Sequence, residues 1–449
     1  AFNADMPYNE FVWSQIAGDK IDREAAVGTG FFALGPNYSS DGGDPASVAQ
    51  AKSETLDDRV DTFSRAFLAL TVACARCHDH KFDPIPTQDY YSIAGVFNNS
   101  REGETALVED HVMRDYHDQQ RAISELLDKI KKSRQTAKQE KREISEEEQA
   151  QIDTWQKDAD ERKAKAPPKY DFAHTIHDSG SSDMQIALRG NMLKPGGVAP
   201  RRFLRIVAGE EREHFTEGSG RQQLADAVVD PDNPLTARVI VNRIWLHHFG
   251  MALVRTPNNF GTLGDKPTPP ELLDWLAATF IESDWSIKSM HRLIMTSATY
   301  RTSSAFNETA FASDGDNRSI WRMNPRRMDV ETWRDSLLAV TGELDVTMGG
   351  PSVDDIVNSS RRTLYAKISR NDPLASDEFL RLFDFPIPRA SNAKRTSYVI
   401  PQQFLFMMNS QFMLDRALAL AERLQNESNE PKSRIERAYT LLYGRKPSD

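Results

Sequence analysis

The only two cysteines of this chain lie three positions apart and are followed at once by a histidine, in Cys74-Ala75-Arg76-Cys77-His78. This C-x-x-C-H spacing is the one used to attach haem c. The thiols of Cys74 and Cys77 can each add to a vinyl group of one porphyrin, and His78 then lies under the ring and can give an imidazole to the iron. The motif therefore predicts a fold that builds a wall for a porphyrin.

The same thiols have two alternative uses. Cys74, Cys77 and His80 also form C-x2-C-x2-H, and with Asp83 or His111 as a fourth ligand they could hold a tetrahedral structural zinc. A bare C-x-x-C can also be a redox disulfide, although no βαβ pattern surrounds it here. Haem c is the leading interpretation, because neither alternative needs a histidine directly after the second cysteine.

The sixth ligand of the iron is not fixed by the spacing. A methionine would raise the reduction potential and suit electron transfer, a second histidine would lower it, and an open position would suit small-molecule chemistry. His80 is too close along the chain to reach the opposite ring face, so we expect it to support the iron ligand or to contact a propionate. The candidates downstream of the motif are His111, Met113, His117, Met184 and Met192.

Periodicity places the motif between two helices. Apolar residues near helical spacing predict an amphipathic helix from Leu56 to Ala73 that delivers the thiols at its end. Pro84 and Pro86 cannot continue a helix. Thr87 is then expected to cap a short, aromatic-rich helix from Gln88 to Phe97, which would complete the wall for the ring.

A highly charged segment follows, with few apolar residues and no glycine between residues 118 and 166. It predicts a helical hairpin insertion over residues 116–166, with a reversal near Lys141 to Ser145. Such an insertion serves either as a docking arm for a partner or as a solvated extension without a ligand.

The length of 449 residues predicts two or three domains in a mainly α fold with few short strands. We expect a multi-helical domain with the motif in residues 1–115, the hairpin in 116–166, an irregular connector in 167–219 and a second multi-helical domain in 220–449. The connector is expected to contain a short strand, Phe203 to Val207. Near the end of the chain we expect one long helix from Pro401 to Gln425.

Charge and hydropathy limit the partners. The net charge of −10 argues against binding to nucleic acid, and no apolar run is long enough to cross a membrane. Haem c is attached on the oxidising side of the cytoplasmic membrane, so a periplasmic or other extracytoplasmic location is expected. Three arginine pairs could bind an anionic group such as an acidic polysaccharide, or could be paired within the protein: Arg201-Arg202, Arg326-Arg327 and Arg361-Arg362.

Several ordered blocks resemble two planctomycete-specific domain families of unknown function, one of them a cytochrome c-type domain and the other its companion domain. Residues 1–8, 15–19, 29–35 and the block CARCHDHKFDPI at 74–85 resemble the back half of the cytochrome-type domain. The companion domain is resembled by NPLTAR at 233–238, VNRIW at 241–245, ELLDWL at 271–276, HRLI at 291–294 and PQQFL at 401–405.

This resemblance implies haem c, an extracytoplasmic setting, and a chain that lacks the start of its cytochrome-type domain. It also implies a redox partner protein or a haem domain upstream. One departure stands out, because we expect an aspartate before Phe260-Gly261 and the chain has Asn259. The predicted function is an electron-transferring c-type haem protein within a larger oxidoreductase. The alternatives are a zinc-stabilised binding or scaffold protein, or a polysaccharide-active enzyme in the rear domain.

Overall fold

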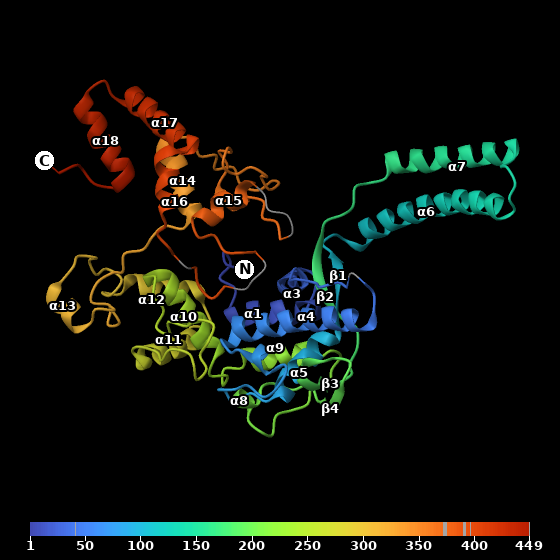
Figure 1. The fold of residues 1–449 in the computed structure, drawn as a ribbon, viewed down its shortest axis with the longest axis horizontal. Helices are drawn as coiled ribbons and strands as arrows, with labels where there is room; N and C mark the ends of the chain where they lie inside the picture. The colour runs from blue at the N-terminus through green and yellow to red at the C-terminus, as the bar shows by residue number, and fades with distance from the viewer. Residues whose placement is uncertain (41, 371–374, 389–391, 396, 449) are drawn as a thin grey trace. The chain divides into compact units, whose positions relative to one another are not determined.

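The structure is a computed structural model that describes residues 1–448 apart from positions 41, 371–374, 389–391 and 396. The described chain is mainly helical, as the sequence predicts, and its short strands form two antiparallel pairs (Figure 1). It divides into two compact units. Unit 1 comprises Ala1–Ile244 with Asn258–Thr296, and unit 2 comprises Trp245–Pro257 with Ser297–Asp449.

Unit 1 contains most of the helices and all four named strands of the described residues. Its elements are α1 (Tyr8–Ala17), α2 (Arg23–Ala26), α3 (Gly30–Ala33), α4 (Pro45–Phe63), α5 (Thr87–Asn98), β1 (Ser100–Ala106), α6 (Asp110–Gln139), α7 (Glu146–Lys165), β2 (Phe172–Asp178), β3 (Met184–Ala187), β4 (Pro195–Ala199), α8 (Arg205–Ala208), α9 (Arg221–Val229), the start of α10 (Thr236–Phe249), α11 (Pro270–Glu282) and α12 (Ile287–Thr296).

The boundaries of the two compact units differ from those of the segments expected from the sequence, 1–115, 116–166, 167–219 and 220–449. The first part of the rear segment belongs to unit 1, because a fully buried arginine ties it to the front of the chain. The guanidinium of Arg221 donates to both carboxylate oxygens of Asp19 at 2.6 and 2.7 Å and to Oδ1 of Asp178 at 2.8 Å. A buried guanidinium needs such partners, since an unpaired charge away from water is costly.

The helix expected from Leu56 to Ala73 ends early, and this part of the prediction is wrong. The α-helix α4 stops at Phe63, a π-helical turn covers Ser64–Leu68, and Ala69 takes a left-handed conformation with φ of 50°. The guanidinium of Arg243 donates to the carbonyls of Arg65 and Ala66, both at 2.7 Å. These carbonyls are satisfied from outside, so the helix can end before the apolar pattern does.

The charged segment forms two long antiparallel helices, α6 and α7, which run side by side and continue from β1 and β2 (Figure 1). The reversal lies between Gln139 and Glu146, as predicted, and Ser145 caps α7 in a capping box with Glu148. A narrow apolar seam holds the pair together through Ile123, Ile130, Ala137, Ile152 and Ala159, all buried. Most of the remaining residues of both helices are polar and exposed.

Three of the four short strands, β2, β3 and β4, lie within the segment 167–219. β1 pairs with β2 from Ser100 opposite Asp178 to Ala106 opposite Phe172, and β3 pairs with β4 across an irregular register. The strand expected over Phe203 to Val207 is wrong, because this segment begins the short helix α8. A hydrogen bond from a distant residue favours the helix here. Oδ2 of the buried Asp89 side chain accepts the backbone N–H of Arg205 at 2.8 Å, at the start of α8.

Unit 2 is also helical. Its elements are the end of α10, α13 (Glu308–Ser313), α14 (Val330–Thr341), α15 (Ala375–Leu382), α16 (Pro401–Asn409), α17 (Gln411–Glu427) and α18 (Pro431–Tyr443). The single helix expected from Pro401 to Gln425 is broken at Ser410, whose hydroxyl accepts the N–H of Met413 and caps α17. Within the described part of the chain, no helix is long and apolar enough to span a membrane.

Candidate functional site

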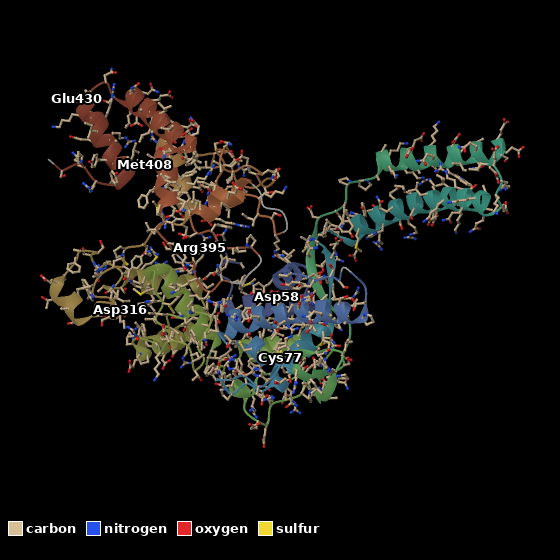
Figure 2. The ribbon with its side chains drawn as sticks, in the orientation of Figure 1. Asp58, Cys77, Asp316, Arg395, Met408 and Glu430 are labelled. Carbon is tan, nitrogen blue, oxygen red and sulfur yellow. The ribbon has the colours of Figure 1, made fainter. Side chains whose placement is uncertain are left out.

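The C-x-x-C-H motif lies in an irregular loop in unit 1, after the end of α4. Cys74 belongs to a short 3-10 helix, Val72–Ala75, and both thiols are free and exposed. Cys77 is labelled in Figure 2. Tyr91 of α5 fastens the loop from behind, because its hydroxyl lies 3.1 Å from the carbonyl oxygen of Arg76 and 3.2 Å from that of Ala187. Burial raises the pKa of Tyr91 to about 12, so the hydroxyl stays a donor.

His78 is exposed and has a defined ring tautomer. Its Nδ1 lies 2.7 Å from the backbone carbonyl oxygen of Asp79. A carbonyl can only accept a hydrogen bond, so we assign the proton to Nδ1 and the lone pair to Nε2. The same hydrogen bond is common in metal-bound histidines, where it fixes the ring and raises the basicity of the ligating nitrogen. His78 therefore offers Nε2 to a metal.

Asp79 links this histidine to the following helix. Its carboxylate accepts the backbone N–H of Thr87 at 2.8 Å, in the first turn of α5. The helix N-terminus is thus capped by a side chain eight residues earlier in the chain, and Thr87 is a helical residue rather than the predicted cap. The peptide that holds the His78 ring is in this way fixed to a helix.

His80 has no free ring nitrogen. Its Nδ1 accepts the backbone N–H groups of Phe82 at 3.2 Å and Asp83 at 2.8 Å, so Nε2 carries the proton. Nε2 lies 3.0 Å from the hydroxyl oxygen of Thr71. The side chain is 6% exposed. In the part of the chain that the structure describes, no three His, Cys, Asp or Glu side chains are grouped to hold a metal ion. His80 stabilises the turn that follows the motif.

The segment around Phe260 packs against this turn within unit 1. The buried carboxylate of Asp83 accepts the N–H of Thr262 at 2.6 Å, and the N–H of Phe260 donates to the carbonyl of Ala69 at 2.7 Å. A Cβ on Gly261 would lie 2.3 Å from Oδ2 of Asp83, so only glycine fits there. Sequence reasoning did not foresee this contact, since its partners are about 180 residues apart.

Asn259 stands where the resemblance leads us to expect an aspartate. Its Oδ1 accepts the N–H of Gly261 at 2.9 Å, which closes a turn of the kind that aspartate and asparagine both form. Asn259 therefore forms the same turn as an aspartate would, but it does not carry the negative charge of an aspartate. This segment therefore holds the motif loop from outside while adding no charge to it.

The other acidic residues near the motif serve the fold. Asp89 is fully buried, and burial raises its pKa against the opposing effect of Arg212 and the Arg205 amide. The sequence had suggested that Asp79, Asp83 and Asp89 could orient His78 or His80. Only the backbone carbonyl of Asp79 contacts His78, and Asp83 lies 3.6 Å from Nε2 of His80.

The loop between β3 and β4 touches the motif. Gly190 has φ of 77°, and a Cβ on it would lie 2.7 Å from the sulfur of Cys77. Glycine is needed here for two reasons, the left-handed backbone and the close approach of the thiol. The irregular connector predicted for 167–219 thus provides one side of the motif's surroundings.

The arginine pairs proposed as anion-binding groups are largely occupied by protein partners. Arg201 is buried and its Nε lies 3.1 Å from Asp183. Arg326 donates to the carbonyl of His247 at 2.6 Å, and Arg327 lies 3.2 Å from Asp384. In the third pair, Arg361 donates to the carbonyl of Gly349 at 2.6 Å, and Arg362 lies 3.9 Å from Asp335.

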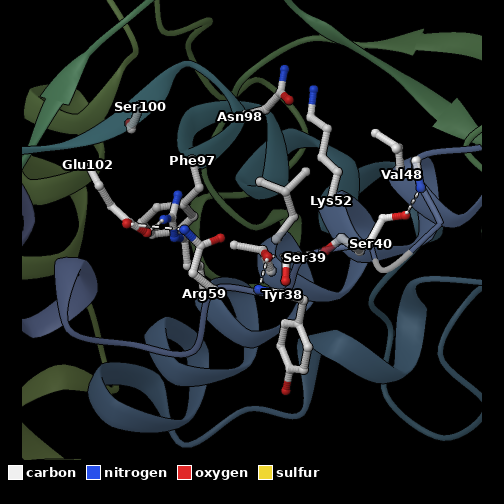
Figure 3. A pocket seen from close by; sticks show the side chains of 15 residues that line it. Tyr38, Ser39, Ser40, Val48, Lys52, Arg59, Phe97, Asn98, Ser100 and Glu102 are labelled. Atoms are coloured by element: carbon white, nitrogen blue, oxygen red, sulfur yellow. Dashed lines mark hydrogen bonds and ion pairs between the residues drawn. The ribbon is translucent and has the colours of Figure 1, made fainter. Parts of the chain in front are cut away.

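A cavity of about 520 Å³ lies beside α4, lined also by the end of α5, by β1 and by residues 37–40 and 43 (Figure 3). An ion pair crosses it, because Nη2 of Arg59 lies 2.7 Å from Oε1 of Glu102. Asn37 donates to the other oxygen of Glu102 at 3.2 Å. No local sequence pattern predicts this cavity, because its lining comes from α4, α5, β1 and the chain before α4.

Comparison with known proteins gives two family matches. Residues 220–449 match the family model described as "PSD1: Protein of unknown function (DUF1553)". Residues 1–102, which include the C-x-x-C-H motif, match that described as "PSCyt2: Protein of unknown function (DUF1549)". No curated protein and no solved structure is significantly similar to the chain. Because the first model covers more than half of the sequence, the chain belongs to the PSD1 family of proteins of unknown function (DUF1553).

Proposed function

We propose that this chain is an extracytoplasmic c-type haem protein that transfers electrons, as the redox part of a larger planctomycete-type oxidoreductase. The observation that carries the proposal is the contact between Nδ1 of His78 and the backbone carbonyl oxygen of Asp79. This contact leaves Nε2 of His78 available directly after two free, exposed thiols. A histidine that ligates haem iron needs this arrangement.

The residues fit the group in chemistry as well as in spacing. In each attachment, the S–H of Cys74 or Cys77 adds across one vinyl C=C, so that sulfur bonds to one carbon and the hydrogen ends on the other. Nothing leaves, and the thiols must be reduced when the bond forms, as they are in the structure. A haem held by Cys74, Cys77 and His78 would supply a one-electron couple at its iron.

The protein residues hold the attachment loop in place and leave its two thiols exposed. Tyr91 ties the loop to α5, and Asp79 ties His78 to the start of that helix. Cys74, Cys77 and His78 themselves are exposed. An exposed attachment loop suits exchange of electrons with a redox partner protein or with a haem domain in the same polypeptide.

The zinc alternative has less support from the geometry. It requires His80 to give a lone pair to the metal, whereas Nδ1 of His80 accepts two backbone N–H groups and Nε2 faces the hydroxyl of Thr71. Opening these three hydrogen bonds would cost about 1 kcal/mol each before any metal is bound. Zinc therefore remains an outcome of the test below.

The test is covalent haem staining of denatured protein that has matured with a haem c assembly system. Wild type and His111→Ala, a control at an exposed histidine on α6, should stain equally. The double variant Cys74→Ser/Cys77→Ser should be colourless while keeping the wild-type far-ultraviolet circular dichroism, since both side chains are exposed. Unstained wild-type protein that binds one zinc per chain would contradict the proposal.

A further inference from the structure

The loop from Leu188 to Lys194 is closed on itself beside the motif. The N–H of Leu188 donates to the carbonyl of Lys194 at 2.9 Å, and the N–H of Lys194 donates to the carbonyl of Asn191 at 2.9 Å. Oδ1 of Asn191 accepts the N–H of Leu193, also at 2.9 Å. Met192 lies between these bonded residues, so its backbone is fixed without any contribution from its side chain.

Two contacts hold this loop against the C-x-x-C-H loop. Gly190 approaches the sulfur of Cys77 so closely that a Cβ would meet it at 2.7 Å. The hydroxyl of Tyr91 is shared between the carbonyl of Arg76, in the motif, and that of Ala187, at the start of the loop. The two loops are therefore neighbours in unit 1, and Met192 is two residues from the point of contact.

The loop also presents apolar side chains that its own fold does not bury. Leu188 is 52% exposed and Leu193 is 54% exposed, on either side of half-buried Met192. Phe82, in the turn after the motif, is 47% exposed. Apolar side chains on two neighbouring loops are the surface that a flat, largely apolar ring attached at Cys77 would cover.

The other candidate ligands are placed or engaged elsewhere. His111, Met113 and His117 lie on the long helix α6, and Nε2 of His117 is 3.0 Å from the hydroxyl of Tyr170. Met184 is buried in β3, where its Cβ is 3.5 Å from the Cβ that Gly95 of α5 would carry. Of the five candidates named from the sequence, Met192 is the one on a loop that contacts the motif.

We infer that Met192 is the sixth ligand of the haem iron, and that the loop Leu188–Lys194 covers the ring face opposite His78. The inference rests on the proposed function. A thioether ligand stabilises the reduced iron and raises the reduction potential, and it closes the iron to small molecules. The chemistry assigned to the site is then electron transfer rather than binding or activation of a small molecule.

The experiment compares haem-loaded wild type with Met192→Ala, Met192→Leu and the control Met113→Ala, which removes a half-buried methionine on α6. Wild type and the control should show the weak far-red charge-transfer band of methionine-ligated ferric haem. Both Met192 variants should lose the band and have a lower midpoint potential. They should also bind added imidazole about tenfold or more tightly, since no internal ligand competes. Met192→His should restore six-coordination without restoring the band.

The outcomes separate this inference from the proposal beneath it. If wild type and both Met192 variants stain for covalent haem and have the same spectrum, potential and imidazole affinity, Met192 is not the ligand and haem c stands. If wild type carries no covalent haem, both statements are wrong. Loss of the band in both Met192 variants but not in Met113→Ala supports the assignment. The leucine variant keeps a side chain of similar volume, so loss of its band is not an effect of a smaller side chain.

Discussion

Replacing Arg221 with methionine should strongly destabilise unit 1. The guanidinium is fully buried and pairs with Asp19 and Asp178, so its removal leaves Asp19 without this cation and leaves Asp178 with Lys20 alone. Loss of one partner from a buried ion pair costs about 3–5 kcal/mol. Unit 1 has roughly 280 residues and an unfolding entropy of about 0.6 kcal/mol/K. The expected fall in its melting temperature is therefore about 5–8 °C.

The assay is calorimetry at a fixed scan rate, with Arg121→Met as the matched control. Arg121 also pairs with an aspartate, at 2.6 Å, but its side chain is 68% exposed, so the control should lose less than about 0.5 kcal/mol. Equal melting temperatures for the two variants would refute the argument that Arg221 ties the front and rear segments into one unit.

The same cluster gives a pH dependence. Burial would raise the pKa of Asp178, but hydrogen bonds from Lys20, Ser219 and Arg221 outweigh it and hold the pKa well below its usual range. A carboxyl whose folded pKa is depressed contributes stability above its unfolded pKa, near 4, and loses it as the pH falls toward the folded value. Wild type should therefore lose stability below about pH 4, and Arg221→Met should lose less over that window.

Three smaller changes test the surroundings of the motif. Gly190→Ala should destabilise the loop by about 1–2 kcal/mol through its left-handed backbone, and should lower haem attachment because the new Cβ meets the sulfur of Cys77; equal staining would contradict this. Asp79→Ala should cost about 1 kcal/mol in urea unfolding by uncapping α5 at Thr87. Tyr91→Phe should cost about 0.5–1.5 kcal/mol, and an unchanged midpoint in either case would count against the assigned hydrogen bond.

Local pattern was enough to predict the helical class and the charged hairpin. Binary patterning and the absence of glycine mark α6 and α7, and proline marks the break between the motif and α5. The chemistry of the C-x-x-C-H spacing is equally local. Each of these features depends on residues that are close together in the sequence.

The end of α4 shows why the rest could not be predicted. Phe67, Leu68 and Leu70 continue the apolar pattern and are indeed buried, yet the α-helix has already ended. The carbonyls of Arg65 and Ala66, in the π-helical turn that follows α4, accept hydrogen bonds from Arg243, which is 177 residues from Ala66. An apolar pattern therefore predicted that these residues are buried, but it did not predict where the α-helix ends. The end of the helix involves Arg243, which is distant in the sequence.

The same reasoning applies to the candidate site. The contact of Gly190 with Cys77 and that of Asp83 with Thr262 join segments that no local pattern connects. The tautomer of His78 depends on a carbonyl whose orientation only the folded turn defines. The sequence therefore named Cys74, Cys77 and His78 as candidates for a haem site, while their surroundings required the structure.

The most direct test of haem c is the optical spectrum of reduced protein, matured with a haem c assembly system and recorded before and after extraction with acidified acetone. The account predicts the sharp visible and Soret bands of a haem protein, with the chromophore remaining on the polypeptide through Cys74 and Cys77 after extraction. A colourless protein, or a chromophore that leaves entirely with the acetone, would contradict it.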